Sequence, residues 1–309
     1  MNPHIYCESL SKHYSGIKAL DGLNLELTIN EPTGIVGPNG AGKSTLFAIL
    51  CGFVRPGSGK VRILGEKPDC GKIKGKFSLL PQDTQMFRNI DVRSQLKHYA
   101  RLQGLDNNSA NKEIDKVISL VQAESFAKQY PETLSFGQRK RVMLAQTLIG
   151  NPELILMDEP TSGLDPVAAT EVHHLLQKLS QHHRIVISSH NLKEIEDICG
   201  DIAILNKGKL VIHTGLSELK RTTQCFSLRL EKKSELHLSE VLTNIPEITH
   251  IENDKNDMRS YLVHYDKCSA EQLQVKILTI LGEKNIAVSE FRKGKALADE
   301  ISAILKNTN

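Results

Sequence analysis

The chain has 309 residues, of which 39% are hydrophobic and 24% charged, and its formal net charge is +3. This composition is typical of a soluble globular protein with about two domains, and it excludes a disordered chain. No run approaches the ~18 apolar residues that a membrane-spanning helix needs, and the first residues lack the apolar stretch of a secretory signal. The six cysteines show no C-x-x-C spacing, which favours free or buried thiols in a reducing compartment. We therefore expect a cytoplasmic protein, and the nearly balanced charge gives no support for nucleic acid as a partner.

Up to residue 220, short β-branched runs alternate with helical patterns, which predicts an α/β domain with a mainly parallel sheet. The expected strands are His4–Glu8, Leu23–Ile29, Thr33–Val36, Val61–Leu64, Phe77–Leu80, Leu154–Met157, Arg184–Ser188, Ile202–Leu205 and Lys209–His213. The expected helices are Gly42–Leu50, Val92–Gln103, Ser109–Val121, Phe136–Leu148, Pro166–Ser180 and Leu192–Ile198. Because residues 85–150 hold helical patterns and no strong strand, we expect a helical lobe inserted into this domain.

Residues 221–309 have a different pattern and predict a second, small α+β domain. Expected strands are Phe226–Leu230, Ile248–Asn253, Tyr261–His264 and Ile286–Phe291; expected helices are Leu238–Leu242, Ala270–Leu281 and Leu297–Leu305. The role of this domain stays open between regulation, dimer contact and docking to a partner.

The strongest motif is G-x-x-x-x-G-K-[ST], which stands between an apolar strand and a helical run. Its residues are Gly37, Pro38, Asn39, Gly40, Ala41, Gly42, Lys43, Ser44 and Thr45. The glycines let the backbone point several N–H groups at phosphate oxygens, and the following helix adds the positive end of its dipole. Lys43 supplies a positive charge to the outer phosphates, and the hydroxyl of Ser44 is a ligand for Mg²⁺. The motif, known as Walker A, predicts a P-loop NTPase core that binds a nucleotide.

A pair of carboxylates, Asp158 and Glu159, follows the buried run Leu154–Met157. The carboxyl end of a buried parallel strand opens on the crevice where ligands bind in α/β sheets. In this Walker B position, Asp158 is expected to hold Mg²⁺, and Glu159 is expected to accept a proton from the attacking water. Two solvated acids at a strand end are the alternative, which the nearby phosphate loop disfavours.

Two other classes of nucleotide enzyme fit poorly. Guanine-binding proteins usually carry N-K-x-D, but Asn206-Lys-Gly-Lys209 lacks the acid and is better explained as a turn. A small-molecule or nucleotide kinase would need a site for its acceptor substrate.

The run Leu134-Ser-Phe-Gly-Gln-Arg-Lys-Arg141 stands before the carboxylate pair and resembles the L-S-G-G-Q signature of the ATP-binding cassette (ABC) ATPases. The resemblance covers residues 3 to about 220 and includes Gln82 as the Q-loop, Asp165 in the D-loop and His190 as the switch histidine. It also places Tyr14 where this family stacks an aromatic ring on adenine.

The resemblance implies a mechanism that needs two copies of the cassette. Two cassettes would meet head to tail, each ATP lying between the phosphate loop of one and Ser135, Gly137 and Gln138 of the other. Glu159 would polarise the water, His190 would contact the γ-phosphate, and Gln82 would bind Mg²⁺ and transmit closure to a partner. Asp165 would couple the two cassettes, most simply as a homodimer.

Phe136 departs from the family pattern, which has glycine at the third signature position. We expect its ring to pack against the helical lobe and to leave the contact with ATP intact. Elsewhere, the pairs His173–His174 and His182–His183 lack the i, i+4 spacing of a chelating helix face, so we expect exposed polar histidines.

The implied role is the ATP-hydrolysing subunit of a membrane transporter, located on the inner face of the cell membrane and docked on an integral-membrane permease. We expect the docking groove near Gln82 and residues 84–101. The segment Ser162–Pro166 and the short tail resemble the drug-resistance and antibiotic-export group, which favours export. The alternative is a soluble ABC ATPase that acts on ribosomes or DNA, but the chain lacks the second cassette and the long coiled coil of those proteins. The transported substrate is not encoded in any recognisable motif.

Overall fold

The computed structural model describes residues 2–82, 85–221, 225–232, 238–242, 244–253, 257–266 and 269–294, with Leu297, Ile301, Ile304 and Leu305. The chain divides into two compact units, Met1–Thr214 and Gly215–Asn309. Among the described residues, no helix combines the length and the apolar character needed to span a membrane.

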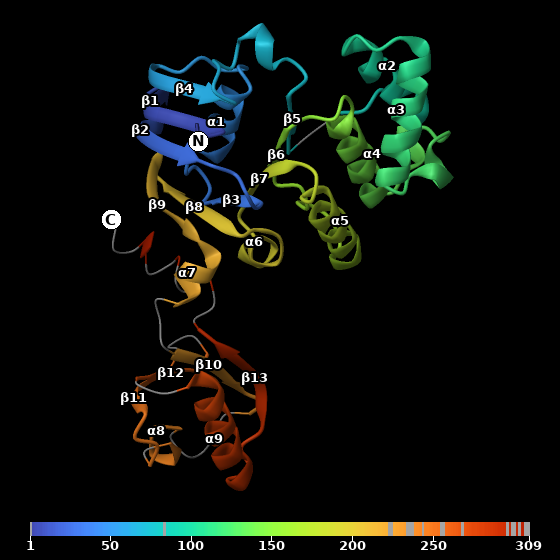
Figure 1. Cartoon of the computed structure of the whole chain (residues 1–309). Helices are drawn as coiled ribbons and strands as arrows, with labels where there is room; N and C mark the ends of the chain where they lie inside the picture. The colour runs from blue at the N-terminus through green and yellow to red at the C-terminus, as the bar shows by residue number, and fades with distance from the viewer. Residues whose placement is uncertain are drawn as a thin grey trace. The chain divides into compact units, whose positions relative to one another are not determined.

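A six-stranded sheet forms the centre of the first unit (Figure 1). Its strands are β3 (Thr33–Val36), β5 (Phe77–Leu80), β6 (Leu154–Asp158), β7 (Arg184–Ser189), β8 (Asp201–Asn206) and β9 (Lys209–Gly215), in the order β5-β6-β7-β3-β8-β9. The pairs β5–β6, β6–β7, β7–β3 and β3–β8 are parallel, which confirms the predicted α/β fold. Asp158 pairs with Ser188 and Val36 with Ser189, so the carboxyl ends of β3, β6 and β7 lie at one edge of the sheet.

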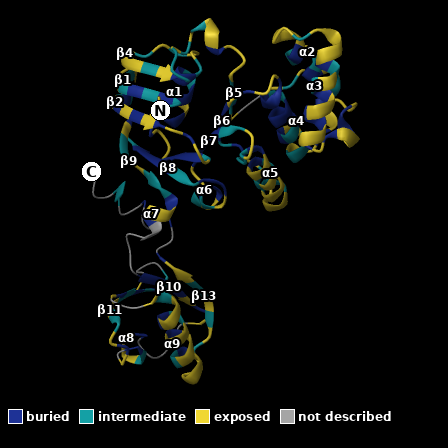
Figure 2. Ribbon diagram, in the orientation of Figure 1, coloured by how far each residue is buried: buried dark blue, intermediate teal, exposed yellow. Residues whose placement is uncertain are grey.

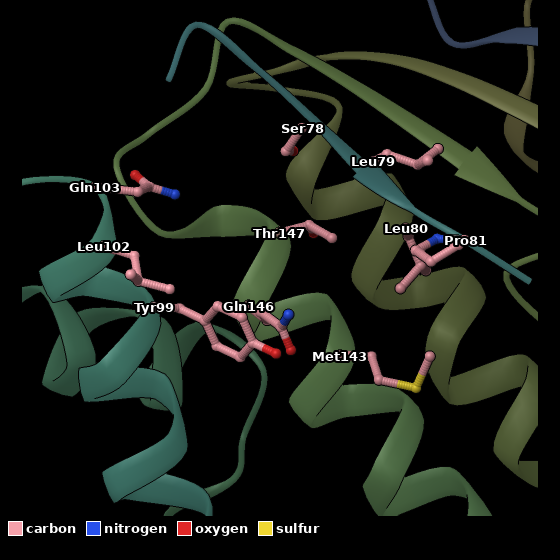
Figure 3. Close-up of a pocket in the computed structure, with 10 residues that line it drawn as sticks. All are labelled: Ser78, Leu79, Leu80, Pro81, Tyr99, Leu102, Gln103, Met143, Gln146 and Thr147. Carbon is pink, nitrogen blue, oxygen red and sulfur yellow. The ribbon is translucent and has the colours of Figure 1, made fainter. Parts of the chain in front are cut away.

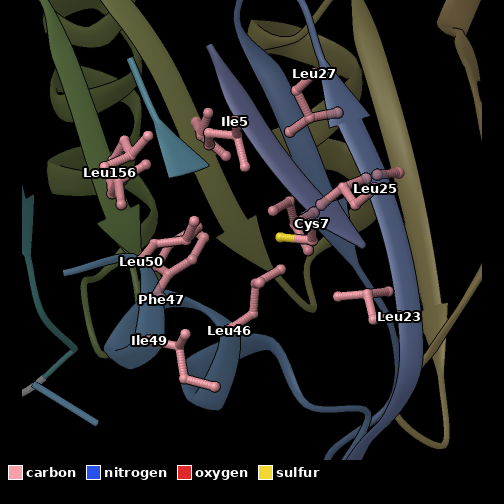
Figure 4. Packing of buried hydrophobic residues seen from close by; sticks show 14 of the residues in the cluster. Ile5, Cys7, Leu23, Leu25, Leu27, Leu46, Phe47, Ile49, Leu50 and Leu156 are labelled. Carbon is pink, nitrogen blue, oxygen red and sulfur yellow. The ribbon is translucent and has the colours of Figure 1, made fainter. Parts of the chain in front are cut away.

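A second, antiparallel sheet has the order β2-β1-β4. Its strands are β1 (Ile5–Tyr14), β2 (Ile17–Leu27) and β4 (Ser58–Ile63), and β1 and β2 are longer than the predicted strands His4–Glu8 and Leu23–Ile29. Helix α1 (Lys43–Leu50) packs on this sheet. Leu46 and Phe47 of α1, Cys7 of β1 and Leu156 of β6 belong to one buried cluster (Figure 4). This shared core anchors the helix that follows the phosphate loop.

The helical lobe consists of α2 (Val92–Leu102), α3 (Asn107–Leu120) and α4 (Phe136–Leu148), with the short 3₁₀ helices Glu124–Phe126 and Pro131–Thr133 between α3 and α4. A further 3₁₀ helix, Gly71–Ile73, precedes β5. The described residues between β5 and β6 form no strand, as predicted. The lobe buries one face of its helices and exposes the other (Figure 2). Asp91 caps α2 by accepting a hydrogen bond from the backbone N–H of Ser94 at 2.9 Å, which confirms the predicted start of this helix.

A pocket of about 220 Å³ separates β5 from the helical lobe (Figure 3). Tyr99 and Leu102 of α2, Met143 and Gln146 of α4 and Ser78 of β5 line it. Helices α5 (Pro166–Leu179) and α6 (Leu192–Ile198) complete the first unit.

The second unit contains a four-stranded antiparallel sheet in the order β11-β12-β10-β13. Its elements are α7 (Leu216–Arg221), β10 (Cys225–Leu230), α8 (Leu238–Val241), β11 (Ile248–Asn253), β12 (Ser260–Tyr265), α9 (Ala270–Glu283) and β13 (Val288–Lys293). From β10 onward, the order β-α-β-β-α-β is that of a split βαβ fold. Phe226, Val263 and Ile277 are fully buried in its core. The helix predicted over Leu297–Leu305 lies mostly outside the described residues.

Candidate functional site

The phosphate loop connects β3 to α1 and requires glycine at two positions for different reasons. Gly42 has φ +104°, and a Cβ on it would lie 2.4 Å from the carbonyl oxygen of Ala19. A Cβ on Gly37 would lie 2.3 Å from the carbonyl oxygen of Leu205. The loop is therefore held tightly against β2 and β8, where any side chain would displace backbone.

Lys43, the first residue of α1, is only 7% exposed. Its Nζ donates hydrogen bonds to the carbonyl oxygens of Gly37 at 2.8 Å and Pro38 at 3.3 Å. Burial lowers the pKa of Lys43, and the nearby carboxylates of Glu159 and Asp158 oppose that shift. The loop thus folds around the ammonium group and keeps a positive charge where phosphate oxygens are expected.

The carboxylate pair stands at the end of β6. Asp158 is 7% exposed, and its Oδ1 accepts a short hydrogen bond from the hydroxyl of Ser188 on β7. Glu159 has φ +49°, a left-handed conformation that is uncommon for a residue with a side chain. Its backbone N–H donates to the carbonyl oxygen of Ser188 at 3.0 Å. The two neighbouring carboxylates have different partners: Asp158 contacts Ser188, and Glu159 contacts Gln82 and His190.

Gln82 and His190 lie on either side of the Glu159 carboxylate. The side-chain amide of Gln82 donates to Glu159 Oε2 at 3.2 Å, and His190 Nδ1 lies 2.9 Å from Glu159 Oε1. The Glu159 side chain is 12% exposed and that of His190 is 58% exposed. The structure therefore brings together the three residues that the sequence predicted to be catalytic.

A cleft of about 630 Å³ joins this carboxylate to the phosphate loop. Its lining residues are Ile17, Ala19, Asn39, Gly40, Ala41, Gly42, Lys43, Ser44, Thr45, Gln82, Glu159, Ser162 and His190. Tyr14, predicted to stack on adenine, does not line the cleft, and its ring is 42% exposed beneath the ammonium group of Lys12. Ile17, three residues further along the same hairpin, belongs to the apolar part of the lining, and the stacking role of Tyr14 stays a prediction.

The signature residues lie outside this cleft, at the start of α4. The hydroxyl of Ser135 accepts from the N–H of Gln138 at 3.2 Å, and the side-chain oxygen of Gln138 accepts from the N–H of Ser135 at 2.9 Å. This reciprocal capping box defines the helix N-terminus. A Cβ on Gly137 would lie 3.1 Å from the Cβ of Ala168, so a side chain there would crowd α5.

Phe136 does not pack into the helical lobe, so the expected packing was wrong; that it leaves the contact with ATP intact stays a prediction. Its side chain is 56% exposed, and two ring carbons lie 3.2 and 3.3 Å from the position that a Cβ on Gly163 would take. Gly163 has φ +77° and lies between Glu159 and the start of α5. As the first residue of α4, Phe136 points away from the lobe core and covers this loop.

Asp165 caps α5. Its Oδ1 accepts hydrogen bonds from the backbone N–H groups of Val167 and Ala168, both at 3.0 Å. Pro166 occupies the first helical turn, as predicted. Within one chain, the Asp165 carboxylate is therefore a helix cap, and its predicted role between two cassettes stays a prediction.

Sequence reasoning missed several polar contacts around the carboxylates. Ser188 was predicted only as part of a strand, but its hydroxyl holds Asp158. His173 was expected to be exposed, but its side chain is 16% exposed and its Nε2 lies 3.6 Å from the buried carboxylate of Glu194. Neither contact has a local sequence signal, because each joins residues that are far apart in the chain.

Known proteins resemble the first unit in both sequence and fold. A family model described as ABC transporter matches residues 20–162. The ABC transporter ATP-binding protein YhaQ of Bacillus subtilis is 32% identical over 216 residues, which cover 70% of this chain and 72% of YhaQ. The chain belongs to the ABC transporter ATP-binding proteins.

Other ABC proteins resemble it to a similar degree. The cobalt import ATP-binding protein CbiO of Salmonella typhi is 33% identical over 68% of this chain and 80% of CbiO. The bacitracin transport ATP-binding protein BcrA of Bacillus licheniformis is 29% identical over 86% of this chain and 84% of BcrA. The ABC relatives therefore include both import and antibiotic-transport proteins.

Solved ABC structures have the same fold. The cassette MJ0796, in a dimeric post-hydrolysis state with ADP and Pi, superposes with a TM-score of 0.62 at 26% identity, covering 69% of this chain and 98% of that one. The cbiO1 protein of Clostridium perfringens, part of the cbiONQ complex, superposes with a TM-score of 0.65 at 27% identity. The superposition covers 80% of this chain and 97% of cbiO1. The P-loop NTPase fold predicted from the sequence is confirmed. This ABC protein is an ATP-binding and ATP-hydrolysing subunit of a transporter.

Proposed function

We propose that this ABC protein energises an exporter, in which two cassettes pair head to tail and hold two ATP molecules between them. The main support is the division of the site: the cleft of one chain holds the phosphate loop, Glu159 and His190, whereas Ser135 and Gly137 lie outside it. A single chain thus lacks the signature contact to its own nucleotide. The dimeric state of the MJ0796 structure supports the same arrangement.

The residues of the cleft have complementary roles in this proposal. Lys43 and the N–H groups of the phosphate loop bind the β- and γ-phosphates. Glu159 accepts a proton from the attacking water, and His190 orients the Glu159 carboxylate and contacts the γ-phosphate. The N-terminus of α4 from a second cassette, capped by Ser135, faces the γ-phosphate from the other side. Catalysis consists mainly of positioning and charge stabilisation.

Magnesium fits the oxygen donors at this site. The hydroxyl of Ser44 lines the cleft, and Asp158 presents a carboxylate that Ser188 holds in place. The side-chain nitrogen of Gln82 is hydrogen-bonded to Glu159, which leaves the side-chain oxygen of Gln82 as a further metal ligand. Hard oxygen ligands of this kind suit Mg²⁺. When bound, the ion would neutralise charge on the phosphates.

The extent of the similarity to BcrA is the comparison that favours export in this proposal. The first unit accounts for 214 of the 309 residues, so the similarity to BcrA, which covers 86% of this chain, must extend into the second unit. The similarity to the cobalt import protein covers 68% of this chain, whereas the cbiO1 structure covers 80% and therefore also reaches the second unit. The second unit thus resembles part of an antibiotic-transport protein.

A groove next to the cleft is the proposed docking surface for an integral-membrane permease. Its volume is about 710 Å³, and its lining runs from Gln82, Gln85, Met86 and Arg88 to the side of α4 that carries Phe136 and Lys140. The predicted segment 84–101 overlaps it, although Thr84 lies outside the described residues. Because Gln82 also contacts Glu159, movement of a docked helix would reach the catalytic carboxylate. This chain would therefore sit on the inner face of the membrane as a peripheral subunit.

The substitution Glu159→Gln tests the catalytic proposal. It removes the proton acceptor and keeps the size of the side chain, so we expect ATP affinity to persist, a nucleotide-dependent dimer to accumulate and turnover to fall by about a thousandfold. Size-exclusion chromatography with ATP and phosphate release measure the two effects. Exposed Glu124→Gln is the matched control. Turnover in Glu159→Gln equal to that of this control would refute the assignment.

Inside-out membrane vesicles that carry the chain with its co-purified permease test the direction of transport. An exporter accumulates its compound inside such vesicles when ATP is added outside. Arg88→Glu, in the docking groove, should reduce co-purification, whereas exposed Arg55→Glu should not. Sedimentation of the chain with ribosomes rather than with membranes would contradict the transport role.

A further inference from the structure

Glu194 is a buried carboxylate that the proposed mechanism does not use. It lies in the first turn of α6, is 1% exposed, and does not line the ATP cleft. Burying a carboxylate costs several kcal/mol unless hydrogen bonds compensate for the lost water. Its neighbours therefore indicate what it does.

Two hydroxyl groups donate to the two oxygens of Glu194. Thr161 Oγ1 donates to Oε1 at 2.7 Å, and Ser189 Oγ donates a short hydrogen bond to Oε2. His173 of α5 approaches from another side, with its Nε2 3.6 Å from Oε1. Asn191 caps α6 and accepts from the backbone N–H of Glu194 at 3.5 Å. The carboxylate is thus held by groups from three different segments.

The two donors belong to the loops that carry the catalytic pair. Thr161 stands two residues after Glu159, and Ser189 immediately precedes His190. One buried carboxylate therefore links the loop after β6 to the loop after β7, behind the site where His190 Nδ1 lies 2.9 Å from Glu159. Hydrogen bonds to a buried charged acceptor are stronger and more directional than bonds at a surface.

We propose that Glu194 is a positioning residue for ATP hydrolysis, which sets the distance between Glu159 and His190 by holding Thr161 and Ser189. The proposal rests on the catalytic roles proposed above for Glu159 and His190. The phosphate loop makes none of these contacts, so the residue controls turnover and not nucleotide binding.

The test compares three variants of the full-length chain. Glu194→Gln keeps the side-chain shape but replaces one acceptor oxygen by an N–H donor, so one of the two hydroxyls can no longer donate to this side chain and must turn to accept from it. Thr161→Val removes one link to Glu194. Ser189→Ala removes the other, together with the hydrogen bond that Ser189 Oγ accepts from the backbone N–H of Asn191 at 3.0 Å. Because a small displacement of reacting groups costs rate, we expect kcat to fall by about tenfold or more, while KM and the ATP dissociation constant change by about twofold at most.

The control is Thr147→Val, which removes the same atoms at another buried position. Thr147 is 6% exposed, and its hydroxyl donates to the carbonyl oxygen of Leu144 within α4. We expect its kcat to match that of the parent. Thermal unfolding of every variant gives the fraction of folded protein, and each kcat is normalised to that fraction.

Either of two results would overturn the proposal. The first is that Glu194→Gln and Thr161→Val keep the same kcat as the control Thr147→Val. The second is that the fold-losses in kcat of Thr161→Val and Glu194→Gln multiply in full when the two substitutions are combined. Losses acting through one contact should not multiply. Glu159→Gln is measured alongside. If it kept turnover, the proposed catalytic assignment would fail; if it lost turnover while Glu194→Gln did not, only the positioning role would fail.

Discussion

Alanine substitutions at three glycines test the geometry of the phosphate loop. Gly42 has φ +104° and its added Cβ would meet a backbone oxygen at 2.4 Å, whereas Gly40 has φ +79° and open space around it. Gly71, in a short 3₁₀ helix, has open space and no positive φ. Comparison of the three positions therefore separates the free-energy cost of a left-handed backbone from the cost of steric overlap with a neighbouring backbone atom.

The expected losses of unfolding free energy follow from these differences. Gly71→Ala should be neutral or stabilise by a few tenths of a kcal/mol, because it only restricts the unfolded chain. Gly40→Ala should cost about 1 kcal/mol, the price of a left-handed residue with a side chain. Gly42→Ala adds the displacement of backbone and should cost about 3 kcal/mol or more.

Urea denaturation followed by circular dichroism gives the free energies, and hydrogen exchange of the amides of α1 assigns the loss to the first unit. ATP affinity should also fall for Gly42→Ala, because the loop must move away from β2 to make room. A loss for Gly42→Ala within about 0.5 kcal/mol of that for Gly40→Ala would refute the reasoning, since the overlap would then have no cost.

Other substitutions and conditions test single contacts. Lys43→Ala should weaken ATP binding by about tenfold to a hundredfold in calorimetry, because a charged hydrogen-bond donor is lost, while exposed Lys178→Ala should not; equal affinity of the two would contradict the phosphate site. Ser188→Ala should raise the magnesium concentration at half-maximal turnover by about tenfold, because Asp158 loses its hydroxyl partner; an unchanged value would count against that role. Burial raises the pKa of the Cys7 and Cys51 thiols from 9.0 to about 12, so their alkylation at pH 8 should be roughly a thousandfold slower than that of a thiol of pKa 9 and should rise about tenfold per pH unit. Mass spectrometry of the native protein measures it, and rates equal to those of the unfolded chain would contradict the burial.

The parts of the fold with local signals could be predicted from the sequence. Pro166 begins α5, as predicted, and the predicted ends of α2 and α4 are followed by Gly104 and Gly150, whose φ values of +92° and +82° suit the end of a helix. The ends of the strands in the antiparallel sheet were predicted less accurately. Register shifts at Ser9 and nearby residues of β1 interrupt the alternation of buried and exposed side chains. Such bulges depend on the partner strand and leave little trace in one strand alone.

The functional site also has a part that local sequence motifs predict and a part that they do not. The phosphate loop and the Asp158–Glu159 pair are contiguous motifs, so their positions follow from the strand that precedes each of them. The contacts of Phe136 and Glu194 depend on which loops the sheet order brings together, and a single sequence does not specify that order. For Phe136, the position on the first turn of α4 was predicted, but the loop facing its ring was not.

The positive φ of Glu159 has a consequence for the evolution of stability in this chain. A glycine or asparagine relaxes in that backbone conformation, and replacing Glu159 by glycine would relieve about 1 kcal/mol of strain. Such a replacement would also remove the carboxylate. The glycine variant would also lose the contacts with Gln82 and His190 and more backbone entropy on folding, so these terms offset the relief of strain and the carboxylate is kept at little net cost to stability.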